Sequence, residues 1–214
     1  MNIANLTTAE IYIQASIAIF MIVNPIDPVK IIIFNDVVSN KGLHRRTAAI
    51  KIAVIVFCIL TVVALVGREL LQLLGINLGA FGVVGGLVVA LMGFEMLYGG
   101  VSSKTQGAGE AEKESVEDEG LIMPLAIPLM AGPGAITTVV TVSTMKDDGS
   151  TITAAVVGVA VVSILVFVGF AYLSGLIARM KPASAAMMAR IGGLLLATIG
   201  AQLMLGGIRT FYEL

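Results

Sequence analysis

Long apolar runs separated by short polar connections dominate this chain of 214 residues. A helix needs roughly 20 predominantly apolar residues to cross the hydrocarbon of a bilayer. Six runs meet that length, over residues 9–38, 47–67, 78–100, 121–145, 151–177 and 189–210. The pattern therefore predicts an all-α membrane protein with six transmembrane helices.

The first run is too long for one straight span, and the sequence Asn24-Pro25-Ile26-Asp27-Pro28-Val29-Lys30 interrupts it. Proline removes a backbone donor and clashes with the preceding turn, which breaks a helix. Hydrocarbon penalises unpaired backbone groups and buried charges, so such a break persists only against protein or a wet cavity. We expect a break at 24–28, near the middle of the membrane. A second break is predicted at 131–134 in the fourth run, within the sequence AGPGA.

A repeat relates the two halves of the chain. The sequences GGLVVALMGFEMLYGG at 85–100 and GGLLLATIGAQLMLGG at 192–207 are offset by half the chain length and share seven of 16 positions. A shift of about the same size moves the first break onto the second. Each half contains three spans, and an odd number means that the second half enters the bilayer from the opposite side. We therefore expect two inverted three-helix repeats, 1–100 and 121–214, joined by an acidic linker at 101–120.

The composition supports a membrane location and argues against several functions. Hydrophobic residues make up 57% of the chain and charged residues only 13%, with a mean hydropathy of +1.00, whereas a soluble domain needs a larger charged fraction. The net charge of -1 indicates no partnership with nucleic acid. We expect neither a metal site nor an enzyme, because the sequence has no His/Cys/carboxylate cluster at metal spacing and no nucleophile elbow.

Lysine and arginine are distributed unequally among the connections. Nine lie in the connections 39–51, 101–120 and 178–190, three lie on the opposite side, and Lys30 lies inside a span. Positive residues concentrate on the cytoplasmic side of membrane proteins. We therefore expect a multi-pass protein of the inner or plasma membrane, with these three connections in the cytoplasm and both termini extracellular or periplasmic.

The two breaks supply the candidate binding residues. Asp27 is a good N-cap and Pro28 suits the first helical position, so together they would begin a new half-helix with free N–H groups and a positive dipole end. The glycines and proline at 132–134 would do the same in the second repeat, and two opposed helix starts suit a carboxylate. Asn24 and Asp27 would then accept hydrogen bonds from a ligand's ammonium. The candidate substrate-binding residues are Asn24, Pro25, Asp27, Lys30, Gly132, Pro133, Gly134, Thr137 and Thr138.

Several of these residues also have a purely structural interpretation. Lys30 lies three residues after Asp27 on the same helical face, so it either pairs internally with Asp27 or serves a substrate or a proton. Thr137 and Thr138 either bond back to their own helix or line the site.

Two further polar residues, Glu95 and Gln202, occupy equivalent positions in the repeats and are secondary candidates. The glycines of the third span, among them Gly82 and Gly86 in GxxxG spacing, are expected to pack helices together. Such faces would also allow association into homo-oligomers.

The sequence resembles the MarC family of integral membrane proteins in the Asn24-Pro25 break and in the motif IPLMAGPGAIT at 127–137. The resemblance covers nearly the whole chain. It implies a multi-pass membrane protein, transport of small neutral amino acids of the SnatA type, and distant kinship with LysE-type amino-acid exporters. Asp27 and Lys30 depart from the family pattern, which has small or apolar residues and a proline there.

Inverted repeats with broken helices in matching positions are typical of secondary transporters, whose site lies where the breaks meet. We therefore expect a transporter of small zwitterionic solutes, with neutral amino acids favoured, coupled to a proton or sodium gradient and without a cofactor. The alternatives are an ion-conducting channel, an exporter of another small solute, and a membrane scaffold that transports nothing.

Overall fold

The computed structural model describes residues 7–40, 42–98, 130–144, 149–177 and 179–212, and within those ranges the regular elements are all helical. Two helices, α1 (Thr8–Val23) and α2 (Pro28–Asn40), form the first apolar run and are bent by 61° relative to each other. The predicted break at 24–28 is therefore confirmed. It follows from local chemistry, because the prolines at 25 and 28 prevent one continuous helix.

The remaining elements follow in the predicted order. They are α3 (Arg45–Leu73), α4 (Leu78–Leu97), α6 (Pro133–Ser143), α7 (Ser150–Val168), the π-helical turn η4 (Gly169–Leu173), α8 (Ser174–Ile177) and α9 (Pro182–Phe211). Helices α3 and α9 extend beyond the predicted spans 47–67 and 189–210. Hydropathy marks the part of a helix suited to hydrocarbon, whereas good helix formers such as Arg, Gln and Ala extend a helix past it.

Four stretches of the described chain are helical, long and apolar enough to cross a membrane: 45–73, 78–97, 150–177 and 182–211. The bent pair of α1 and α2 brings the number to five when it is counted as one span. The short apolar helix α6 is the second half of the predicted fourth span. Its predicted first half and the acidic linker at 101–120 lie outside the described residues, so the six-span inverted repeat stays a prediction.

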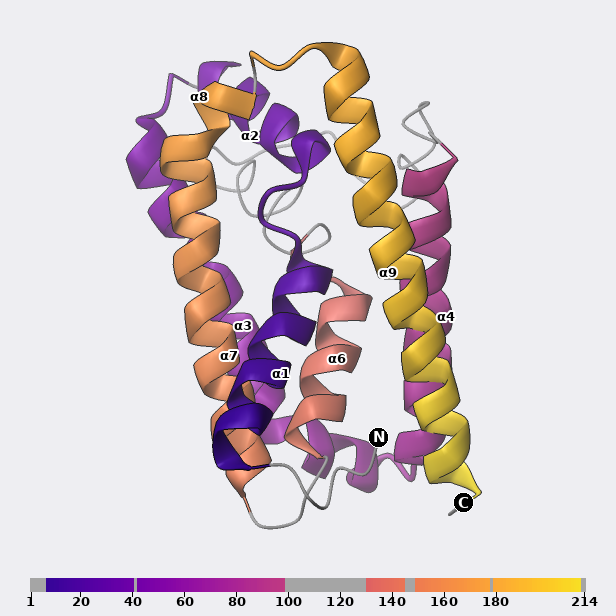
Figure 1. The fold of residues 1–214 in the computed structure, drawn as a ribbon. Helices are drawn as coiled ribbons and strands as arrows, with labels where there is room; N and C mark the ends of the chain where they lie inside the picture. The colour runs from indigo at the N-terminus through magenta and orange to yellow at the C-terminus, as the bar shows by residue number, and fades with distance from the viewer. Residues whose placement is uncertain (1–6, 41, 99–129, 145–148, 178, 213–214) are drawn as a thin grey trace.

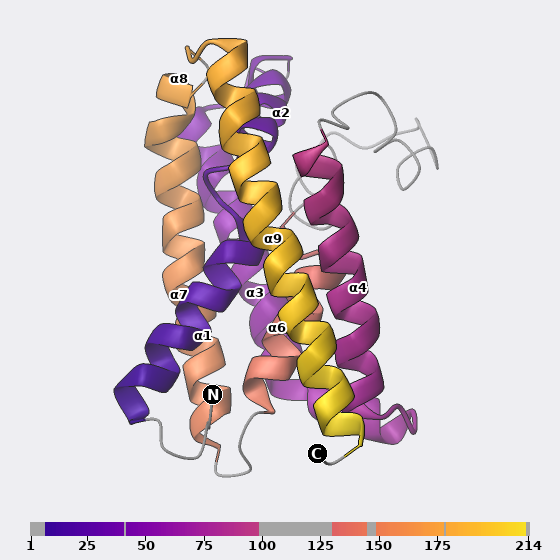
Figure 2. The same ribbon diagram turned by 45° about the vertical axis from the view of Figure 1, so that its right-hand side comes forward.

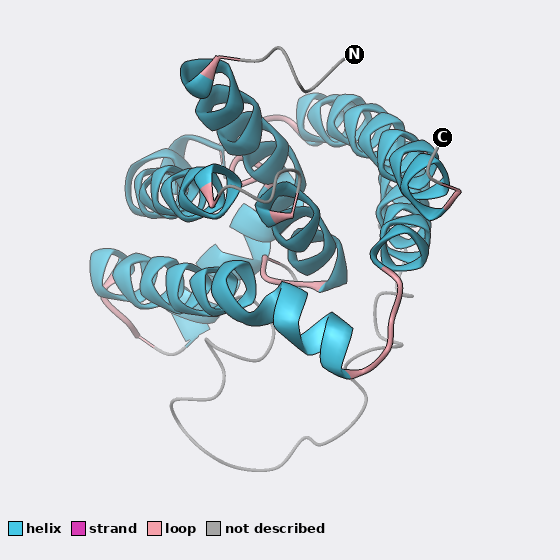
Figure 3. Ribbon diagram, turned by 90° about the horizontal axis from the view of Figure 1, so that it is seen from below, coloured by secondary structure: helices cyan, strands magenta, loops and turns pink. Residues whose placement is uncertain are grey.

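The helices form an elongated bundle, seen mostly end-on in Figure 3. Helix α7 packs against α1, α3 and α6, while α4 and α9 run side by side along their lengths (Figures 1 and 2). The start of α1 and the end of α9 lie at the same end of the bundle (Figure 1). Which end faces the cytoplasm stays a prediction from the charge distribution.

Helices α4 and α9 are antiparallel and meet through glycines. A Cβ atom added to these glycines would lie about 2.6 Å or less from backbone atoms of the opposite helix, so no side chain fits. In a membrane, small residues stabilise helix pairs because they allow the backbones to approach closely. The facing pairs are Gly79 with Gly207, Gly86 with Gly200, and Gly93 with Gly193.

Candidate functional site

The first break removes the helical N–H donors of carbonyl groups at the end of α1. Asn24 ends the helix with a left-handed φ of 41°, a conformation that asparagine tolerates better than most residues. Its N–H donates to the Phe20 carbonyl at 2.8 Å. Pro25 has no N–H, so the Met21 carbonyl loses the donor that a continuous helix would provide. The negative end of the α1 dipole therefore lies at the break.

Two buried charged residues close the other side of this break. The Asp27 carboxylate accepts a hydrogen bond from the Val29 N–H at 2.9 Å, which is the N-cap role predicted for it. The Lys30 ammonium reaches back across the break and donates to the Val23 carbonyl at 2.7 Å. Asp27 is 5% exposed and Lys30 is 7% exposed. Each charge is thus engaged with the end of a half-helix, rather than the two being paired directly with each other.

The start of α6, at the position of the predicted second break, has free N–H groups. Gly132 is the N-cap residue and Pro133 the first helical residue, and no side chain caps this end. The first backbone bond of the helix runs from the Ile136 N–H to the Gly132 carbonyl at 3.0 Å. The N–H groups of Gly134 and Ala135 therefore have no acceptor within the helix. The positive end of the α6 dipole lies here.

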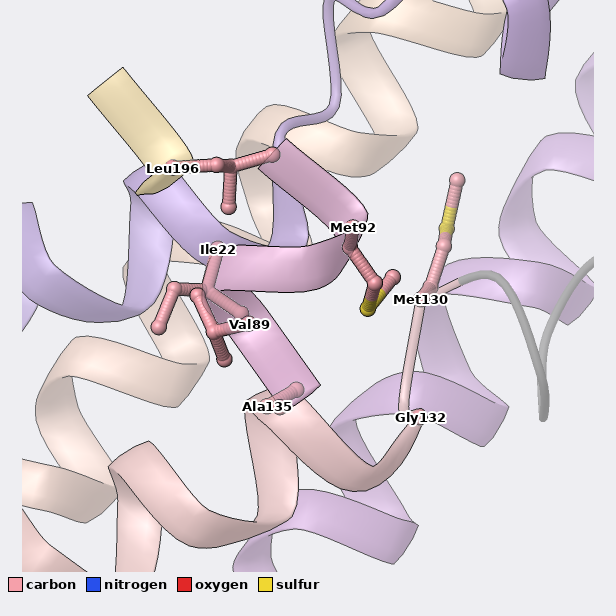
Figure 4. A pocket seen from close by; sticks show the side chains of 8 residues that line it. Ile22, Val89, Met92, Met130, Gly132, Ala135 and Leu196 are labelled. Carbon is pink, nitrogen blue, oxygen red and sulfur yellow. The ribbon is translucent and has the colours of Figure 1, made fainter. Parts of the chain in front are cut away.

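A small cavity lies where these two helix ends meet (Figure 4). Residues from α1, α4 and α9, together with the chain at the start of α6, line it: Ile22, Val89, Met92, Met130, Gly132, Gly134, Ala135 and Leu196. The end of α1 and the start of α6 lie side by side part-way along the bundle (Figures 1 and 2). The cavity thus combines apolar side chains with the two residues whose N–H groups are free.

The structure brings together only part of the predicted site. Gly132 and Gly134 line the cavity, whereas Pro133 is exposed. Asn24 instead approaches α9, where a Cβ atom on Gly192 would lie 3.4 Å from its Nδ2. Asp27 and Lys30 are not among the lining residues. The free N–H groups at the cavity therefore belong to α6 and not to α2.

The predicted polar residues on α4, α6 and α9 make other contacts. The Thr137 hydroxyl donates to the Pro133 carbonyl and the Thr138 hydroxyl to the Gly134 carbonyl, each at 2.9 Å. Both threonines therefore bond back to their own helix, which is the structural one of the two predicted roles. Glu95 on α4 and Gln202 on α9 are exposed and do not line the cavity.

The apolar residues that line the cavity were not among the predicted site residues. A single apolar residue in an apolar helix cannot be recognised as part of a site from the sequence. The offset between the two halves of the repeat, however, relates several of the lining residues. Val89 and Leu196 are separated by the repeat offset of half the chain length, and Ile22 and Met130 by an offset only one position longer. Equivalent positions of the two halves therefore meet at one cavity.

A π-helical turn opposite the first break was also not predicted. A Cβ atom on Gly169, where this turn begins, would lie 3.0 Å from the Pro25 carbonyl oxygen. The rings of Phe34 and Phe170 pack edge to face with centroids 4.7 Å apart, which joins α2 to the turn. Such π-helical turns occur frequently at functional sites.

Comparison with known proteins identifies the family. MarC family integral membrane proteins match residues 9–212 of the chain. A UPF0056 membrane protein of Pyrococcus horikoshii is 35% identical over 195 residues, covering 89% of this chain and 90% of its own. One from Methanocaldococcus jannaschii is 32% identical over 206 residues, covering 94% and 97%. The Escherichia coli protein YhcE is 26% identical over 205 residues and covers 94% of each chain.

The names of these relatives describe membrane proteins and state no substrate. No solved structure matches the chain. The family match spans nearly the full length, and the described helices provide four to five candidate membrane spans. The chain therefore belongs to the MarC family of integral membrane proteins.

Proposed function

We propose that this protein is a secondary transporter that moves small zwitterionic solutes, with neutral amino acids as the favoured class, across the cell membrane and is coupled to an ion gradient. One observation carries the proposal: the carbonyl end of α1 and the N–H end of α6 meet at a small cavity that α4 and α9 also line. Discontinuous helices with ends of opposite polarity at one site are the usual substrate site of secondary transporters.

The two helix ends match the two charges of an amino acid. The substrate carboxylate would bind the free N–H groups of Gly134 and Ala135 at the positive end of α6. The substrate ammonium would bind carbonyl groups at the negative end of α1, where Ile22 lines the cavity. Both groups are main-chain atoms, so the site recognises the part that all amino acids share.

The apolar lining indicates the size and character of the substrate side chain. The cavity has a volume of about 10 Å³, which is space for about one water molecule. Entry of even glycine therefore requires the lining to move. Met92 and Met130 face the cavity (Figure 4), and methionine is the apolar side chain that changes rotamer most readily. A short apolar side chain fits such a lining better than a long or charged one.

The cavity also supports the proposed pseudo-two-fold arrangement. Val89 and Leu196 are equivalent in the repeat, as are Ile22 and Met130 at an offset one position longer. An inverted repeat places its substrate site on the axis that relates the halves, where equivalent residues converge.

Uptake by purified protein in liposomes tests the proposal. Labelled glycine or alanine should accumulate when a proton or sodium gradient is imposed, and excess unlabelled alanine should compete. Protein-free liposomes are the control. Absence of uptake of any neutral amino acid under either gradient would contradict the proposal. Ion current without saturation would indicate a channel instead.

A further inference from the structure

Lys30 holds an ammonium group at the carbonyl end of a broken helix. Its Nζ donates to the Val23 carbonyl at 2.7 Å, and Val23 is the last residue of α1. The residue is 7% exposed, so its ammonium group is largely shielded from solvent. Unwound carbonyls at the C-terminal ends of half-helices are the groups that coordinate sodium in secondary transporters. The Lys30 ammonium group is therefore hydrogen-bonded to a carbonyl of this kind.

Asp27 supplies a buried anion at the start of the same half-helix, near enough to interact electrostatically with Lys30. It begins α2 three residues before Lys30, is 5% exposed, and one carboxylate oxygen accepts the Val29 N–H. A carboxylate and a main-chain carbonyl are both hard oxygen ligands, which suit an alkali cation as well as an ammonium. The charge of this buried group is balanced locally only as long as a cation is present.

We propose that Lys30 is a tethered cation that occupies the position of a coupling sodium ion, so that this break binds no sodium in the native protein. Transport by the site is then independent of sodium, and this second statement rests on the proposed function above. The first statement concerns binding alone and holds for a transporter, a channel or a scaffold.

Two substitutions at position 30 separate the effect of the ammonium charge from the effect of the side-chain volume. Lys30→Ala removes the ammonium and opens room beside the Val23 carbonyl and the Asp27 carboxylate, which creates a site for a free cation. Lys30→Met also removes the charge, but its side chain of similar length fills the room. The double variant Lys30→Ala/Asp27→Asn keeps the room and removes the anion. Sodium should therefore bind to the first variant and to neither of the other two.

Thermal unfolding of the purified full-length proteins tests this, with sodium chloride replaced by choline chloride at constant ionic strength. The Tm of Lys30→Ala should rise by about 3–6 °C once sodium reaches ten times its Kd. Wild-type protein, Lys30→Met and the double variant should shift by less than about 1 °C, because they offer no cation site that sodium could stabilise by mass action. A sodium-dependent rise in wild-type Tm would overturn the proposal, and so would an unchanged Tm in folded Lys30→Ala.

If Lys30→Ala aggregates, sodium binding to the wild-type protein tests the proposal. Direct binding of radioactive sodium to wild-type protein in detergent should not exceed the binding to protein-free detergent, and saturable binding that Asp27→Asn abolishes would overturn the proposal. Amino-acid uptake should change by less than about twofold when sodium is replaced by choline on both sides. Absence of uptake under all conditions would reject the proposed function, while the sodium results on stability would still decide the role of Lys30.

Discussion

Gly93 of α4 and Gly193 of α9 lie so close that a Cβ atom added to either would be 2.6 Å from the carbonyl oxygen of the other. Gly86 and Gly200 are placed in the same way, two helical turns away along each helix. A shift by half the chain length converts Gly86 into Gly193 and Gly93 into Gly200. Exchange of the two halves therefore converts one glycine pair into the other, which supports an inverted repeat.

This contact predicts that Gly93→Ala destabilises the protein. The added methyl group would meet backbone atoms of α9, which cannot change rotamer, so the two helices would have to separate. Overpacking of this kind costs about 1–3 kcal/mol. We expect a lower Tm in thermal unfolding of the purified protein.

Gly206→Ala is the matched control for this prediction. Gly206 lies on α9, beside Gly207 of the glycine contact, but a Cβ atom there would meet nothing within 4 Å. Alanine is the better helix former by about 1 kcal/mol, so this variant should be as stable as wild type or more stable. Equal losses in the two variants would show that close packing is not the cause.

Gly134→Ala should destabilise the start of α6 in a way that Val89→Ala relieves. A Cβ atom on Gly134 would lie 2.7 Å from Cγ2 of Val89, and a valine side chain has little rotamer freedom to move aside. Truncation of Val89 removes that atom. We expect the double variant to be more stable than the sum of the single effects implies, by about 0.5–3 kcal/mol. Additive changes in the free energy of unfolding across the four proteins would contradict this geometry.

The parts of the fold and site that the sequence predicts are those determined by local chemistry. Pro25 and Pro28 interrupt a helix, and Gly132 followed by Pro133 begins one, so the sequence predicts both the first break and the start of α6. The N-cap role of Asp27 is equally local and was also expected. None of these predictions depends on distant parts of the chain.

Three-dimensional packing determines what the sequence does not predict. The spacing of Asp27 and Lys30 suggested an ion pair, but the break also exposes the Val23 carbonyl, and the Lys30 ammonium bonds to that instead. The cavity residues from α4 and α9, Val89 and Leu196, become neighbours only because glycines bring those helices together. The glycine pattern of the third span predicts a close helix contact, but it does not say which helix is the partner or which apolar side chains converge beside it.

Asp27 and Lys30 should be energetically coupled although they bond to different groups. Both are buried, so the loss of either charge leaves the other uncompensated. Asp27→Asn retains an N-cap acceptor, which isolates the effect of the charge. We expect Asp27→Asn and Lys30→Met each to lower stability, and the double variant to lose at least about 0.5 kcal/mol less than their sum. Thermal or denaturant unfolding of the four proteins measures the coupling, and strict additivity would mean that the two charges do not interact.

Leu196→Ala should broaden the substrate range of the proposed transporter. Leu196 is 5% exposed and contributes to the apolar wall of the cavity, so its truncation makes room for a longer substrate side chain. Each methylene in such a pocket changes selectivity by about 10- to 200-fold. The ratio of alanine to valine uptake in liposomes should therefore fall at least about tenfold. Leu195→Ala is the matched control, because its side chain is 43% exposed and does not line the cavity. A similar fall in both variants, or an unchanged ratio in Leu196→Ala with uptake retained, would exclude this cavity as the substrate side-chain pocket.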